Sequence, residues 1–306
     1  MIQIYSKSAK EKKVNILENP LPNVWINVEN PTEEEMIKLT EEYQLDTSII
    51  RDATDIHEVP RIEVEDKIVY IFTRFVYTDK EQYKTTPLLV IYRKNFIITI
   101  TTTPFPRLHL FLEGKVSFNT KRRRALLLKI LGQVNVTYTN YLNNLNKKLY
   151  SLTFHVEKIS NKDIVQFISY ENVLYELNSA LVRIHTNFTT LHAGKIINFE
   201  EDEKDYVEDL MLESIQLIQI TKENLRTIVN IREAYSTIIT NNLNQVIKLF
   251  TSLTVILTLP TIIASLYGMN VNLPFANSPF AFAGIVIVIA AIMIAILFVF
   301  SRKNWL

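Results

Sequence analysis

A row of hydroxyl side chains interrupts an otherwise apolar stretch near the C-terminus. If this stretch is helical, the row lies on one face, because its members are spaced by four, three and four residues. They are Thr254, Thr258, Thr261 and Ser265, and the same face continues toward the N-terminus with Phe250, Ile247 and Asn244. Such a face could line a water-filled path. Alternatively, each hydroxyl could bond a carbonyl of its own helix, or the face could pack a helix interface.

A single row of hydroxyls makes only one wall, so a path would require several copies of the chain in a ring. In such a ring, Ile247 and Phe250 would form apolar constrictions at which a pore can close by dewetting. Pro260 lies within the stretch and could allow a local bend. The opposite face of the stretch is expected to carry Leu253, Val255, Ile256 and Ile263.

Two apolar runs, residues 249–266 and residues 279–300, contain no charged residue. At about 1.5 Å per residue, either run can cross a hydrocarbon core of about 30 Å as a helix. We therefore predict a transmembrane hairpin over residues 249–306, with spans at about 249–267 and 279–300. The break between the runs begins with Tyr267-Gly268-Met269-Asn270.

Basic residues flank only one side of this hairpin. Lys248 precedes the first run, Arg302 and Lys303 follow the second, and the connecting loop has no Lys or Arg. The positive-inside rule then places both termini in the cytoplasm and the loop outside. Trp305 would suit an interfacial anchor. The expected location is the plasma membrane.

The composition disfavours several classes of function. The 306 residues include 33 basic and 32 acidic side chains, so the net charge points to no particular partner. The basic run at residues 121–124 is expected to start a solvated helix, and we expect no nucleic-acid partner. The absence of cysteine excludes disulfides and thiolate metal sites. We find no Gly-rich phosphate loop and no His-Glu-x-x-His motif, which argues against an enzyme. From the first residues we expect no cleaved signal peptide.

Residues 1–118 are predicted to form a cytosolic domain of the α+β class. Short strands are expected at residues 2–5, 14–17 and 24–28, and two hairpins of an antiparallel or mixed sheet at residues 61–77 and 87–103. Thr32 and Glu35 form a capping-box pattern that starts a helix running to about Tyr43. A second short helix is expected to begin at Asp46 or Thr47.

Helical spacing dominates the rest of the chain. Residues 119–199 are predicted to form an antiparallel helical pair, in which Asn161 caps the second helix and Gly194 ends it. Residues 200–248 form a stalk helix that continues into the first span, because the region lacks glycine and has a single proline. This helix would have about 65 residues and a length of about 100 Å. The alternative is two helices with a kink near residues 241–242.

Together these features resemble the CorA family of divalent-cation transporters, two-span proteins whose first membrane helix ends in Tyr-Gly-Met-Asn. Residues 244–270 align with the family's pore helix without gaps. Residues 52–63 resemble its cytosolic Asp-…-Arg-Pro-Arg-Val-Glu segment, and residues 304–306 resemble its basic-Trp-Leu ending. The resemblance covers the whole chain and implies a funnel-shaped homopentamer in the lipid bilayer, whose five long helices line the pore.

At the outer mouth, the resemblance implies a selectivity filter made of Gly268, Met269 and Asn270. Mg²⁺ loses water reluctantly, so a selective mouth is expected to bind the hydrated ion through oxygen ligands, which Asn270 can supply. Gly268 would allow backbone approach or a positive φ, and Met269 would hold the loop. Asn244 would form a matching polar ring near the cytosolic mouth.

The resemblance also implies that intracellular Mg²⁺ closes the pore by binding between cytosolic domains. Two positions match this pattern, Asp52 in the short helix and Asp209 on the stalk. Asp205, Glu208 and Glu213 lie within about one helical turn of Asp209. Bound Mg²⁺ would neutralise facing carboxylates, and its loss would let repulsion loosen the ring. The alternative is an ordinary solvated acidic face.

Three departures from the family pattern stand out. The loop after Asn270 has no acidic residue, Arg51 stands where an acid is often found, and residues 121–192 contain few carboxylates. Transport of Zn²⁺, Co²⁺ or Ni²⁺ by the same architecture stays open, although the spans contain no Cys or His that would favour soft metals. A membrane-anchored binding or sensor module is the other alternative, but an anchor needs neither a hydroxyl row nor a long stalk.

Overall fold

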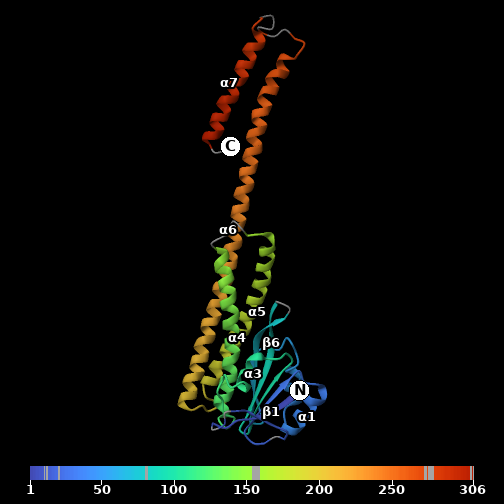
Figure 1. The fold of residues 1–306 in the computed structure, drawn as a ribbon, viewed down its shortest axis with the longest axis vertical. Helices are drawn as coiled ribbons and strands as arrows, with labels where there is room; N and C mark the ends of the chain where they lie inside the picture. Colours follow the sequence, from blue (N-terminus) through green and yellow to red (C-terminus); the bar gives the residue numbers. More distant parts are fainter. Residues whose placement is uncertain are drawn as a thin grey trace. The chain divides into compact units, whose positions relative to one another are not determined.

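A computed structural model gives the fold of the chain (Figure 1). It describes all residues except 10, 12, 20, 80–81, 154–158, 272–273, 275–278, 304 and 306, and except the side chain of residue 161. The chain divides into two compact units, Met1–Ile231 and Arg232–Leu306.

A seven-stranded mixed sheet forms the centre of the first unit. In the order β2-β1-β3-β7-β6-β5-β4, all neighbours are antiparallel except β3 and β7, which are parallel. The strands are β1 (Ile2–Ser6), β2 (Asn15–Leu17), β3 (Val24–Glu29), β4 (Arg61–Glu65), β5 (Ile68–Asp79), β6 (Gln82–Arg93) and β7 (Phe96–Thr101). The two predicted hairpins are therefore β4–β5 and β6–β7. Asp66 and Lys67, both with positive φ, make the first turn, as a two-residue hairpin loop requires.

Helices cover both faces of the sheet, which explains why β5 and β6 are apolar on both sides. On one face, Leu39 of α1 (Glu33–Tyr43) and Ile49 of α2 (Thr47–Asp52) join a core with Ile26 and Ile98. On the other face, Trp25 packs edge-on against Phe111 of α3 (Pro106–Leu112).

The two predicted helix starts in this unit are confirmed. Thr32 and Glu35 form the capping box of α1, and the side chain of Asp46 caps α2 by accepting hydrogen bonds from the backbone amides of Ser48 and Ile49. These bonds satisfy amides that lack a partner within the helix, so they fix where each helix begins. The cap at Asp46 also fixes the position of Asp52, the last residue of α2.

The predicted helical pair consists of α4 (Arg123–Thr153) and α5 (Asn161–His192). The predicted cap at Asn161 is wrong, because Ser160 is the capping residue and forms a capping box with Asp163. Gly194 has a positive φ of 71° just beyond the end of α5, as predicted for a helix terminator.

The basic run at residues 121–124, which leads into α4, is not simply a solvated face. Arg124 bonds Glu203 at 2.8 Å through its Nε atom and also pairs with Glu200, while its Nη1 donates to the carbonyl oxygen of Asn198. These contacts attach the beginning of α4 to the beginning of the long helix that follows.

That helix, α6 (Glu201–Tyr267), has 67 residues without interruption, so the alternative of two separate helices is not found. It contributes residues to both units. The last helix is α7 (Ala281–Arg302), and both α6 and α7 contain segments that are long and apolar enough to cross a membrane. The predicted fold class, an α+β domain with a very long helix and a C-terminal pair of apolar helices, is confirmed.

Candidate functional site

Within the second unit, one face of α6 packs and the rest is exposed. Ser252 and Ile256 are buried, and Val255, Leu259 and Ile263 are half-buried at matching helical spacing. On α7 the half-buried positions follow one row: Ala281, Ile285, Ile289, Met293, Ile296 and Phe300. The two helices lie side by side (Figure 1), and Ile263 and Ile285 line a shared apolar cavity of about 360 Å³.

The predicted hydroxyl row lies on the face of α6 that points away from this packed face. Thr254, Thr258, Thr261 and Ser265 are all exposed, as are Asn244, Ile247 and Phe250. At 100° per residue, this row stands roughly opposite Ser252 and Ile256. Of the residues predicted on the opposite face, Val255, Ile256 and Ile263 are buried or half-buried, whereas Leu253 is 48% exposed.

The threonine hydroxyls of this row donate to their own helix. Thr254 donates to the carbonyl of Phe250 at 2.8 Å, Thr258 to that of Thr254 at 2.6 Å, and Thr261 to that of Thr258 at 2.7 Å. The alternative that these hydroxyls bond carbonyls of their own helix is therefore found for the three threonines. It does not conflict with a water-filled path, because a hydroxyl that donates inward keeps its lone pairs for water.

The Gly268-Met269-Asn270 segment follows the end of α6 as exposed turn residues. The Gly268 amide donates to the carbonyl of Ala264 at 2.9 Å, and the Met269 amide to that of Leu266 at 3.3 Å. Of the two roles expected for Gly268, a positive φ is not found, since among the glycines only Gly114 and Gly194 adopt one. Close approach of the backbone at Gly268 stays a prediction. The acid-free loop that follows lies largely outside the described residues.

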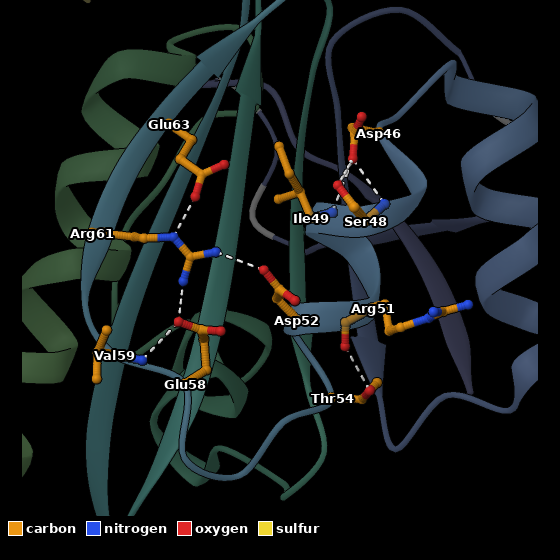
Figure 2. A network of polar contacts seen from close by, with 10 residues as sticks. All are labelled: Asp46, Ser48, Ile49, Arg51, Asp52, Thr54, Glu58, Val59, Arg61 and Glu63. Carbon is orange, nitrogen blue, oxygen red and sulfur yellow. Dashed lines mark hydrogen bonds and ion pairs between the residues drawn. The ribbon is translucent and has the colours of Figure 1, made fainter.

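Asp52 is paired with a cation from its own chain (Figure 2). Its Oδ2 accepts from Arg61 Nη2 at 2.8 Å, and Glu58 and Glu63 also bond the same guanidinium. The guanidinium lies 4.1 Å from the ring centre of Phe72, so it is held from several sides. Three carboxylates around one Arg leave a formal charge of about −2, and Asp52 remains 45% exposed.

The stalk carboxylates, Asp205, Glu208, Asp209 and Glu213, are all exposed on α6. Glu213 accepts a hydrogen bond of 3.3 Å from the amide of Asn135 on α4. Burial raises the pKa of Tyr206, and the nearby charges of Glu213 and Asp209 raise it further. Among the residues that the structure describes, no three carboxylate or imidazole groups gather closely enough to hold a metal ion.

Comparison with known proteins decides the family. The model of the CorA-like Mg²⁺ transporter protein family matches residues 22–302. The chain belongs to the CorA-like Mg²⁺ transporter family. This places it among transporters rather than enzymes, as predicted, and the two apolar helices are those of a CorA-type membrane protein.

Relatives and a solved structure from this family match this chain over nearly its whole length. The cobalt/magnesium transport protein CorA of Methanocaldococcus jannaschii is 24% identical over 290 residues, which covers 92% of this chain and 91% of the relative. The magnesium transport protein CorA of Helicobacter pylori strain 26695 is 24% identical, and the alignment covers 100% of this chain and 100% of the relative. The complete structure of the magnesium transporter CorA from M. jannaschii superposes with a TM-score of 0.89 at 22% identity, covering 100% of this chain and 99% of that one.

Arg61 is the residue that sequence reasoning missed at the candidate sites. It lies in the segment that resembles the family, but a basic residue among acids was not assigned a role. The signal was one basic residue among nearby acids, Glu58, Arg61 and Glu63. Arg61 and Glu63 stand two positions apart in β4, so their side chains lie on the same face of the strand.

Proposed function

We propose that this protein forms a homopentamer that carries hydrated Mg²⁺ into the cytoplasm along a path lined by α6. The observation that supports this most directly is the exposed hydroxyl row on the face of α6 opposite its packed face. In this proposal Asn244, Ile247, Phe250 and the hydroxyl row line the path, and Gly268, Met269 and Asn270 form its outer mouth. Both termini are cytoplasmic.

The bonding of the threonines suits a hydrated cation. Water held by Mg²⁺ presents its hydrogens outward, so the wall of the path must supply acceptors. Thr254, Thr258 and Thr261 spend their hydrogens on helix carbonyls and offer lone pairs. Such a wall attracts hydrated cations without a fixed charge that would trap them. The membrane potential would drive entry with about 4.6 kcal/mol per 100 mV for a divalent ion.

The need for several copies follows from the exposed surfaces of the second unit. No residue of α7 is buried, and the hydroxyl row of α6 is open along its length. If the row faced lipid, the lone pairs of these hydroxyls would have no hydrogen-bond donor, whereas a ring of copies would turn them toward water. The number five rests on the family resemblance.

Reconstituted flux tests the assignment of the mouth. In liposomes, Asn270→Ala is expected to lower Mg²⁺ uptake by about tenfold or more, because the ring loses its side-chain oxygen ligands. Asn241→Ala is the matched control, since this asparagine lies on α6 but off the row. Equal uptake by Asn270→Ala and the parent would remove Asn270 from the filter.

The same assay separates the alternative ions. The relative from M. jannaschii is described as a cobalt/magnesium transport protein, so Co²⁺ is the first competitor to test, followed by Ni²⁺ and Zn²⁺. Preferred uptake of Zn²⁺ would replace the Mg²⁺ assignment. Absence of any flux by a correctly assembled sample would favour a membrane-anchored sensor module.

We further propose that internal Mg²⁺ closes the path by binding between copies at Asp52 and at the stalk carboxylates around Asp209. The partial exposure of Asp52, the exposure of the stalk carboxylates, and the lack of a metal cluster within the described part of one chain support a site shared between copies. Combined Asp52→Lys and Asp209→Lys is expected to raise the internal Mg²⁺ needed for half-closure by about tenfold, because two fixed cations replace the ligands. Closure at the parent concentration would exclude this pair as the sensor.

A further inference from the structure

A polar cleft of about 640 Å³ lies in the first unit, at a distance in sequence from every residue assigned to the ion path. Its walls come from the end of β5 and the beginning of β6, from the segment that leads into α3, and from the middle of α4. Residues that line it include Tyr77, Tyr83, Thr103, Arg107, Asn140 and Asn144. A cleft of this size accommodates a small organic molecule.

Arg107 is the cation of this cleft. Its Nε donates to the side-chain oxygen of Gln133 at 2.8 Å, which fixes the plane of the guanidinium. Within the described part of the chain, no carboxylate pairs with Arg107, and neither Nη atom has a hydrogen-bond partner. Burial lowers the pKa of Arg107, as expected for a cation without an anionic partner. Two free Nη groups in a fixed plane form the fork that binds phosphate or carboxylate oxygens in pairs.

The acidic residue that also lines the cleft does not neutralise Arg107. The carboxylate of Asp79 is bonded to Lys84 Nζ at 2.7 Å, so its charge is already compensated. The described lining therefore has an excess of positive charge at Arg107.

The remaining walls offer polar and aromatic contacts. Asn140 and Asn144 are exposed one turn apart on α4, so their amides point from the same helix face. The ring of Tyr83 packs at 4.4 Å against the buried ring of Tyr141, which holds this wall in place. Amides and aromatic edges suit the organic part of a ligand whose anionic group lies on Arg107.

We propose that this cleft binds a small organic anion, with its phosphate or carboxylate group held by Arg107 and its organic part held by Tyr83, Asn140 and Asn144. A bound anion would connect the β5–β6 hairpin to α4 and stabilise the first unit. The site is independent of the ion path, so it does not depend on the transport proposal.

Direct binding to the full-length protein tests the site. Adenosine 5′-monophosphate and succinate represent the phosphate and carboxylate forms of the anion, and adenosine is the uncharged control; binding is measured by calorimetry without added Mg²⁺. We expect saturable binding of at least one anion below about 1 mM and none of adenosine in that range. Failure of both anions to bind below about 1 mM, or equal binding of adenosine, would overturn the proposal.

Variants locate the binding group. Arg107→Gln is expected to weaken anion binding by about tenfold or more, because the charged fork is lost. Arg107→Lys should keep only part of the anion binding, since a single ammonium group cannot form two parallel hydrogen bonds to one phosphate or carboxylate group. Arg122→Gln, an exposed arginine outside the cleft, should bind as the parent does. Parent-like binding by Arg107→Gln with an unchanged melting temperature would place the anion elsewhere and overturn the proposal.

Discussion

The two units differ in where their polar groups find partners. In Met1–Ile231, buried polar side chains bond to distant parts of the chain: Trp25 to Thr99, and Asn187 to the carbonyl of Phe72. In Arg232–Leu306, the described hydroxyls of Thr254 and Thr258 bond only to carbonyls four residues back in the same helix. The first unit is stabilised by its own tertiary contacts, whereas the second has local bonds and largely exposed helices.

This difference indicates which surroundings each unit requires. A unit whose buried donors and acceptors are satisfied internally can be stable in water. A pair of apolar helices with almost no buried residues cannot, because its exposed aliphatic surface must be covered by lipid or by other copies. Changes to side chains should therefore affect stability in the first unit and ion flux in the second.

The largest effect is expected at Arg74, which is 8% exposed and donates to the carbonyls of Ile56, Glu58 and Thr85. Arg74→Met would leave these buried acceptors without a donor, so we expect the free energy of unfolding to fall by about 3 kcal/mol. Denaturation of the detergent-solubilised protein, followed by the fluorescence of buried Trp25, measures this change.

Arg93→Met is the control for this prediction, because among the described residues the side chain of Arg93 makes one hydrogen bond, of 3.4 Å to the carbonyl of Tyr43. Its effect should be below about 1 kcal/mol. If both variants unfold at the same denaturant concentration, the buried hydrogen bonds of Arg74 are not what stabilises the first unit.

The second effect concerns flux rather than folding. Thr254→Val combined with Thr258→Val keeps the shape of the two side chains but removes two acceptors from the hydroxyl row. We expect Mg²⁺ uptake in liposomes to fall by about tenfold, with little change in thermal stability. Ser252→Ala removes a hydroxyl from the opposite, buried face, and its uptake should stay close to that of the parent. A larger loss in Ser252→Ala would show that the row does not line the path.

The smallest effect is expected at Arg61, whose positive charge lies among Asp52, Glu58 and Glu63. Arg61→Gln would release Asp52 and leave three uncompensated carboxylates, so internal Mg²⁺ should close the path at about threefold lower concentration. The measurement is flux against internal Mg²⁺. A shift toward higher Mg²⁺ would mean that Arg61 supports the regulatory site instead of competing with the ion.

Local patterns predicted most of the elements. The capping box at Thr32, the cap at Asp46 and the terminator at Gly194 were visible in sequence because each involves residues within a few positions of one another. The cap of α5 was misplaced by one residue, since Ser160 and Asn161 are both good capping residues and only the backbone geometry chooses between them. The beginning of β6 at Gln82 was missed because its first residues are polar and lack alternation.

The sequence alone determined the transmembrane hairpin, the hydroxyl row and the family, because these depend on spacing and composition along one helix. Only the tertiary structure showed that this row lies opposite the packed face of α6 and that the carboxylate of Asp52 is paired with Arg61. It also showed that Arg107 stands in a cleft with no anionic partner among the described residues. Such facts depend on which distant residues meet across a sheet or between helices. Side-chain pairing over long sequence separation is decided by packing, and no local pattern records it.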